Sequence, residues 1–144
     1  MRLSELFREV EFDGSIKNDA DINLVTDDSR LVRPGSLFVC IRHRSFDGHT
    51  AALDALASGA EAVVTQDRLG LENELHVADS RSAYARLCAA LCNHPERRLR
   101  MIGVTGTNGK TTVTTLIRNI LSDSGTKTLL TGTVCNRLGD KNLP

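Results

Sequence analysis

Hydrophobic positions in the first hundred residues change their spacing several times along the chain. Leu3, Leu6, Phe7 and Val10 recur at helical spacing, which predicts a short amphipathic helix over residues 3–10. Short apolar runs bounded by turn residues predict strands instead. By these criteria we expect strands at residues 22–27, 36–41, 62–65 and 75–78, and helices at residues 50–59 and from Asp79 or Ser80 to about residue 93.

Turn residues separate these elements. Pro34 and Gly35 precede one strand, where Pro presets φ and Gly accepts a positive φ. Gly59 follows a helix at the position where Gly commonly closes one, and Pro95 prevents the next helix from continuing. Strands that alternate with helices indicate an α/β fold with a largely parallel sheet.

A second strand–loop–helix unit follows the polar stretch His94–Arg98, which we take as the domain boundary. We therefore expect a small N-terminal α/β domain, residues 1–96, and an incomplete phosphate-loop domain, residues 97–144. The elements expected in the second domain are a strand at 99–104, a Gly-rich loop, a helix at 110–123 and a strand at 127–131.

After that loop the sequence provides one helix, one expected strand and a tail. A phosphate-loop domain normally needs several parallel strands, so we expect this second domain to be incomplete. A lone strand–loop–helix–strand unit leaves sheet edges and one helix face exposed. Residues 1–94 should therefore be more stable than residues 99–144.

Composition narrows the class of protein. Apolar residues make up 40% and aromatic residues only 3%, so the core must consist mainly of Leu, Val, Ile and Ala. The net charge is zero, which argues against a broad nucleic-acid surface. No apolar run approaches the roughly 20 residues of a membrane span, and the N-terminus lacks a signal peptide. We expect a cytoplasmic, monomeric protein whose four cysteines are reduced thiols.

The segment between the expected strand and the expected helix has the composition of a phosphate-binding loop. Glycines let the backbone N–H groups approach an anion, aided by the helix N-terminus. The candidate ATP-binding residues are Gly106, Thr107, Asn108, Gly109, Lys110, Thr111 and Thr112. Lys110 brings a positive charge to the β- and γ-phosphates and is the candidate catalytic residue. Thr111 places a hydroxyl where Mg²⁺ coordination is expected.

The loop is a variant of the common phosphate-loop pattern. The common pattern has a Gly five residues before the position of Gly109, but this chain has Val104 there. The chain instead has glycines at positions 103 and 106. The Gly-x-Gly-x-x-Gly pattern is absent, which counts against a dinucleotide site.

Read from Gly103 to Thr112, the loop resembles that of the Mur ligase superfamily. The first hundred residues resemble the N-terminal domain shared by the MurE and MurF types. The motifs that carry this resemblance are Asp28-Ser29-Arg30, Pro34-Gly35, Leu37-Phe38-Val39, Asp47-Gly48-His49, Gly59-Ala60 and Val63-Val64. The MurE type is favoured by the amino-acid sequence of the phosphate loop and by the segment Gly132-Thr133-Val134 with Asn136.

The resemblance implies an ATP-dependent ligase that forms an amide in peptidoglycan-precursor synthesis, with Mg²⁺ and ATP. Its substrates would be UDP-MurNAc-L-Ala-D-Glu and a diamino acid, either meso-diaminopimelate or L-lysine. Family analogy implies that UDP-MurNAc contacts Asp27, Ser29, Arg44, Ser45 and Phe46. Arg30 is equally suited to a structural pairing with a carboxylate.

One residue departs from the family pattern in this substrate loop. The family usually has Gly where this chain has His43, and a Gly lost from a ligand loop can change its backbone geometry. The other histidines fit structural or surface roles better than catalysis. Two alternatives stay open: a MurF-type or other ligase of the superfamily, and a non-catalytic nucleotide-binding module. We expect no turnover by this chain alone.

Overall fold

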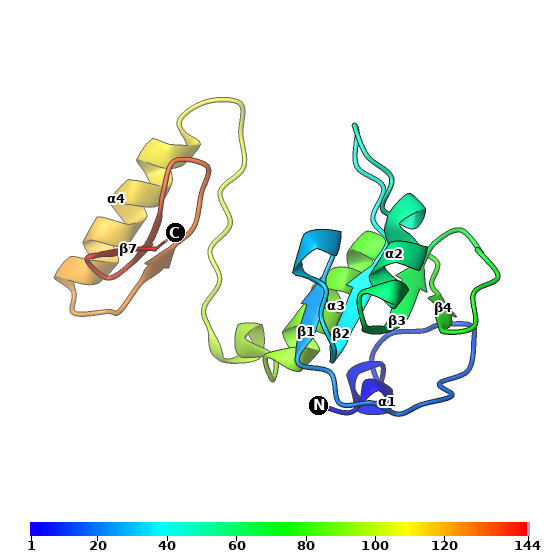
Figure 1. Ribbon diagram of the computed structural model, residues 1–144. Coiled ribbons are helices and arrows are strands. Elements are labelled where there is room, and N and C mark those ends of the chain that lie inside the picture. The colour runs from blue at the N-terminus through cyan, green and yellow to red at the C-terminus, as the bar shows by residue number, and fades with distance from the viewer. Residues whose placement is uncertain (144) are drawn as a thin grey trace. The chain divides into compact units, whose positions relative to one another are not determined.

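The computed structural model describes residues 1–143 and divides the chain into two compact units, Met1–Leu99 and Arg100–Pro144 (Figure 1). We describe each unit by itself. The boundary expected from the sequence, between residues 96 and 97, stays a prediction of where the functional domains meet.

The first unit, all of whose residues are described, is built on a four-stranded parallel sheet in the order β1-β2-β3-β4. Its strands are β1 (Leu24–Thr26), β2 (Ser36–Val39), β3 (Ala60–Thr65) and β4 (Glu74–His76). All four expected strands of this half are therefore present, somewhat shorter or shifted at their ends. The prediction of an α/β fold with a parallel sheet is confirmed.

Helices cover both faces of this sheet. Successive side chains of a strand point to opposite faces. Leu37 and Val39 therefore pack with the helices of one face, while Phe38 and Cys40 pack with the helix of the other. The first face carries α1 (Leu3–Leu6) and α3 (Ser80–Leu91), and the second carries α2 (Ala52–Ala57). Short 3₁₀ turns occur at η1 (Ser29–Leu31), η2 (Gly48–Ala51) and η3 (Pro95–Arg98).

The two outer helices of the first face differ in how well the sequence predicts them. Asp79 caps α3 by accepting hydrogen bonds from the backbone N–H groups of Arg81 and Ser82, as a capping residue should. The helix expected over residues 3–10 ends at Leu6. Phe7 and Val10 are still buried, so their apolar spacing reflects burial in the core rather than a continuous helix.

The second unit contains α4 (Lys110–Asp123), whose bounds are those expected. The strand expected at residues 127–131 is also present, although it is shorter than expected. Two other expectations for this unit, a strand at residues 99–104 and a tail after the last strand, are wrong. Residues 99–104 are extended but belong to no strand among the described residues, because a strand needs a neighbouring backbone to bond with. The chain after α4 forms three antiparallel strands that bond with one another, β5 (Leu129–Leu130), β6 (Asn136–Leu138) and β7 (Lys141–Leu143).

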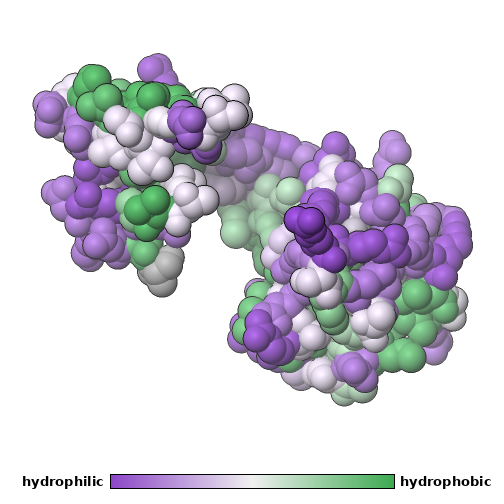
Figure 2. Space-filling model, turned by 90° about the horizontal axis from the view of Figure 1, so that it is seen from above, coloured by the Kyte–Doolittle hydropathy of each residue, from purple (hydrophilic) through white to green (hydrophobic). Residues whose placement is uncertain are grey.

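No residue between 100 and 143 is buried. The apolar side chains of α4 show this most clearly, since Val113, Leu116 and Ile120 are 43%, 56% and 68% exposed. Figure 2 shows apolar residues at the molecular surface. The buried core found among the described residues therefore belongs to the first unit. Within residues 1–143, no helix has the length and hydropathy required to cross a membrane.

Candidate functional sites

A cavity of about 460 Å³ lies at the carboxyl ends of β1 and β2. Ligands of open parallel sheets bind at this edge, because loops from several strands meet there. The cavity is lined by Asp27, Asp28, Ser29, Arg30, His43 and Phe46.

The β1 side of the cavity is a tight turn held by Asp28. The backbone N–H of Asp28 donates to the buried Thr26 hydroxyl at 3.0 Å. Its carboxylate accepts the Arg30 backbone N–H at 3.0 Å and the Arg30 guanidinium at 2.6 Å. The hydrogen bond from the Arg30 side chain is the main reason that the pKa of Asp28 falls to about 2. Arg30 is thus paired with a carboxylate inside its own turn.

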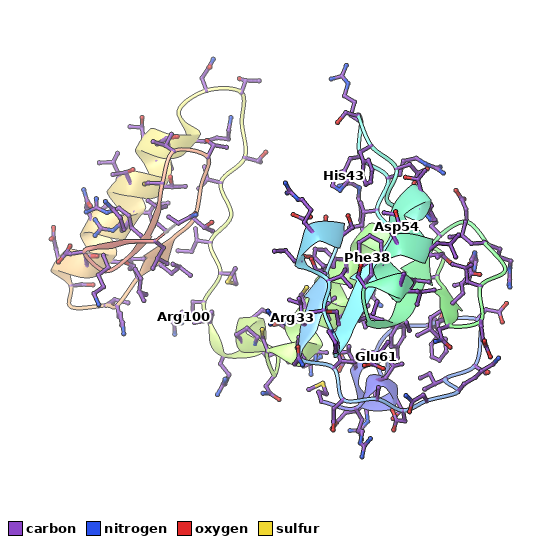
Figure 3. The ribbon with its side chains drawn as sticks, viewed as in Figure 1. Arg33, Phe38, His43, Asp54, Glu61 and Arg100 are labelled. Carbon is purple, nitrogen blue, oxygen red and sulfur yellow. The ribbon has the colours of Figure 1, made fainter. Side chains whose placement is uncertain are left out.

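The β2 side of the cavity is a loop between Arg42 and Asp47, which form an isolated antiparallel bridge. The His43 backbone N–H donates to the Phe46 carbonyl at 2.7 Å, so Arg44 and Ser45 form the exposed tip. Phe46 is 49% exposed and lines the cavity. Figure 3 shows His43 in this loop, beyond the end of β2.

His49 joins this loop to the loop that follows β3. Its Nδ1 lies 2.6 Å from Asp47 Oδ1, and its Nε2 accepts the backbone N–H groups of Gln66 and Asp67 at 3.1 and 3.3 Å. These partners place the ring proton on Nδ1 and give His49 a structural role. The hydrogen bond from the His49 side chain is the largest cause that holds the pKa of Asp47 well below its usual range.

Asp47, His49 and Asp67 have ligand atoms within 4.8 Å of one another, close enough to surround a cation. However, Arg42 donates to both carboxylates, and His49 Nε2 already accepts two backbone N–H groups. Both oxygens of Asp47 and both ring nitrogens of His49 are therefore already occupied by protein groups, which argues against a cation at this cluster.

The structure brings together three of the five residues that the resemblance gave for UDP-MurNAc. Asp27, Ser29 and Phe46 line the cavity, whereas Arg44 and Ser45 lie at the exposed loop tip beside it. The sequence did not single out Asp28 as a lining residue. Its position in the Asp28-Ser29-Arg30 motif was the available signal.

The Gly-rich loop of the second unit leads directly into α4. Gly106 and Gly109 have φ values of +149° and +77°, which favour glycine. No side chain caps the N-terminus of α4, so its first N–H groups have no capping partner from a side chain. The Lys110 ammonium donates to the Gly106 carbonyl and, at 3.2 Å, to the Thr107 carbonyl.

These features fit a nucleotide phosphate with its metal ion. Uncapped N–H groups at a helix N-terminus attract an anion, and the Lys110 ammonium lies over the same loop. Thr111 and Thr112 are exposed in the first turn of α4, so the Thr111 hydroxyl is free to meet a Mg²⁺ ion. A divalent cation there would neutralise phosphate charge.

Two family patterns match this chain. Residues 21–97 match the pattern described as "Mur ligase family, catalytic domain", and residues 104–143 match "Mur ligase middle domain". The first match covers the cavity residues, and the second covers the Gly-rich loop from residue 104 and α4.

Curated relatives agree with these matches. A protein of Listeria monocytogenes named UDP-N-acetylmuramoyl-L-alanyl-D-glutamate--2,6-diaminopimelate ligase is 37% identical over 99% of this chain. A protein of the same name from Geobacillus kaustophilus is 46% identical over 86% of it. The chain spans 30% and 26% of the length of these two relatives.

Solved structures show the same similarity. A structure titled UDP-N-acetylmuramoyl-L-alanyl-D-glutamate--2,6-diaminopimelate ligase superposes on all of this chain with a TM-score of 0.77 and 29% identity. This chain covers 30% of the length of that structure. The MurF ligase from Thermotoga maritima in complex with ADP matches 69% of the chain, and 23% of its own length, with a TM-score of 0.51 and 28% identity.

Proposed function

This chain belongs to the Mur ligase family, and we propose that it provides the UDP-substrate-binding domain and the ATP phosphate loop of a MurE-type ligase. That enzyme adds diaminopimelate to UDP-N-acetylmuramoyl-L-alanyl-D-glutamate in the cytoplasm. The main support is that one chain contains both a cavity at the edge of its parallel sheet and a Gly-rich loop leading into a helix whose N-terminus no side chain caps. A relative named as a diaminopimelate ligase matches 99% of this chain.

In this proposal the segment from Gly106 to Thr112 binds the phosphates of ATP. The backbone N–H groups at the start of α4 donate hydrogen bonds to the phosphate oxygens. Lys110 leaves the two loop carbonyls to which it donates and binds the β- and γ-phosphates instead. Because the ammonium already lies over the loop, this exchange needs only a rotation of its side chain. Thr111 is the proposed ligand to Mg²⁺.

The cavity of the first unit is the proposed site for the UDP end of the second substrate. Asp27 and Ser29 offer acceptors to the donor groups of uridine, and the half-exposed ring of Phe46 offers an apolar face to a base. Arg44 and Ser45, at the loop tip, are placed to meet the diphosphate. Arg30 contributes indirectly, because its guanidinium holds the Asp28 turn.

The reaction of the complete ligase transfers the γ-phosphate of ATP to the D-Glu carboxylate. The amine of the incoming amino acid then attacks this acyl phosphate, phosphate leaves, and an amide forms. We assign only the two binding steps to this chain and expect it to bind both nucleotides, as a monomer, without forming product.

Isothermal titration of residues 1–144 with Mg-ATP and with UDP tests the assignment. Lys110→Ala should weaken ATP binding at least tenfold and leave UDP binding unchanged, because the hydrogen bonds of Lys110 within residues 1–143 go to carbonyls of its own loop. Lys127→Ala, an exposed lysine of the same unit, is the matched control. Absence of ATP binding by the unaltered chain would contradict the assignment of the phosphate loop.

A phosphate-release assay distinguishes the binding module from the enzyme. It uses ATP, UDP-MurNAc-L-Ala-D-Glu and diaminopimelate with the purified chain. We expect no product, and detectable turnover would overturn the assignment of binding alone. In a full-length relative, preference for D-alanyl-D-alanine over diaminopimelate would favour the MurF-type alternative, to which structural similarity is also seen.

A further inference from the structure

The loop between Arg42 and Asp47 is closed at its base, where these two residues form a bridge and an ion pair at 2.9 Å. Toward its tip, the His43 side chain extends to the other wall of the cavity. Its Nε2 lies 3.3 Å from Asp27 Oδ2, at the end of β1. This contact joins two segments that the chain separates by the whole of η1 and β2.

Asp27 is a firm anchor for such a contact. It directly follows a strand that is paired with β2, and its side chain is 29% exposed. Tyr84 of α3 lies close enough to Asp27 to interact with its carboxylate. Burial is the main cause that raises the pKa of Tyr84 to about 12, and both Cys88 and Asp27 add to the shift through charge and hydrogen bonding. The Tyr84 hydroxyl therefore stays protonated as a donor.

His43 meets Asp27 in addition to Tyr84, whereas two arginines near the cavity are paired with other carboxylates. Arg30 donates to both oxygens of Asp28, and Arg42 donates to Asp47 and Asp67. A ring Nε2–H is a sufficient donor to a carboxylate, whether or not the other ring nitrogen carries a proton. A glycine at position 43 has no side chain and cannot make this contact.

We propose that His43 is a positioning residue that latches the loop to Asp27 and holds Arg44, Ser45 and Phe46 in place for the UDP moiety of the substrate. This inference rests on the proposed function of the cavity. A loop ordered before binding loses less conformational freedom when the ligand enters, so affinity rises without a new ligand contact.

Two substitutions at one position test the latch. His43→Ala removes the donor, whereas His43→Gln keeps an N–H donor at a similar reach from the backbone. Hydrogen exchange of the amides of residues 43–47 reports loop order, and titration with UDP reports affinity. In His43→Ala we expect exchange about tenfold faster and UDP affinity roughly fivefold lower, while His43→Gln stays within about twofold of the unaltered chain.

A third variant identifies the anchor. In Asp27→Ala the loop amides should exchange as fast as in His43→Ala, and adding the second substitution should change nothing further, since both remove the same contact. Additive effects of the two substitutions would show that they act separately and would overturn the latch.

The remaining outcomes separate the latch from the proposed function. If the unaltered chain binds UDP and His43→Ala changes neither exchange nor affinity, the latch is refuted and the cavity assignment stands. If His43→Gln behaves like His43→Ala, the polar contact of the side chain with Asp27 is not the cause and the latch is also refuted. If the unaltered chain binds no UDP, the cavity assignment fails and so does the role of the latch in binding.

Discussion

Leu87→Ala tests whether the two units owe their stability to one core. Leu87 lies on α3, is fully buried, and packs in the cluster that joins α1, α3 and one face of the sheet. Shortening it should destabilise the unit Met1–Leu99 alone, because no described residue of the second unit is buried.

The size of the effect follows from the burial. Replacing a buried Leu by Ala in a packed core costs about 2–5 kcal/mol, because apolar contact is lost and a cavity remains. A unit of this length has a free energy of unfolding of about 5–15 kcal/mol. The variant should therefore still fold, but a loss of about 3 kcal/mol raises its unfolded fraction roughly a hundredfold.

Hydrogen exchange followed by mass spectrometry measures both units in one experiment. Amides of β2 and β3, which exchange through global opening, should exchange about a hundredfold faster in Leu87→Ala. Amides of α4 should exchange early in the unaltered chain and equally early in the variant. Leu53→Ala is the matched control, since Leu53 lies on α2 but is 65% exposed. It should cost less than about 0.5 kcal/mol.

Two results would refute the reasoning. Protection of α4 equal to that of β3 in the unaltered chain would show that the second unit is stabilised despite its lack of buried residues. A hundredfold acceleration of α4 exchange in Leu87→Ala would show that the two units unfold together.

Three further predictions concern the first unit. Asp79→Ala removes the α3 cap and should lower the free energy of unfolding by about 1 kcal/mol in urea titration; no change would mean that other groups satisfy those N–H groups. The pKa of Asp28 falls to about 2 on folding, so its pairing with Arg30 stabilises the fold above about pH 4 and is lost as the pH falls toward 2. In Asp28→Asn the Tm should therefore fall less steeply between pH 4 and pH 2 than in the unaltered chain, and an unchanged pH dependence of the Tm would contradict this. Gly59→Ala should destabilise by about 1–3 kcal/mol, because Gly59 has a φ of +101° and an added Cβ would meet Pro34 at 3.1 Å; calorimetry showing an unchanged Tm would exclude that strain.

The sequence by itself determined most local features. Apolar runs identified the four strands of the first unit, Asp79 marked the start of α3, and the helix expected at residues 110–123 has the bounds of α4. The phosphate loop was also readable, because its chemistry depends on consecutive residues. In each case the cause acts over a few neighbouring positions, which is the range that spacing and propensity describe.

Tertiary structure decided which strands pair and which distant side chains meet. Residues 99–104 have the composition of a strand but bond with no neighbour among the described residues, while β5, β6 and β7 pair with one another. The contact of His43 with Asp27 exists only because parallel pairing brings the ends of β1 and β2 together. Periodicity along a chain carries no information on pairing register, so the cavity wall and its latch became visible only in three dimensions.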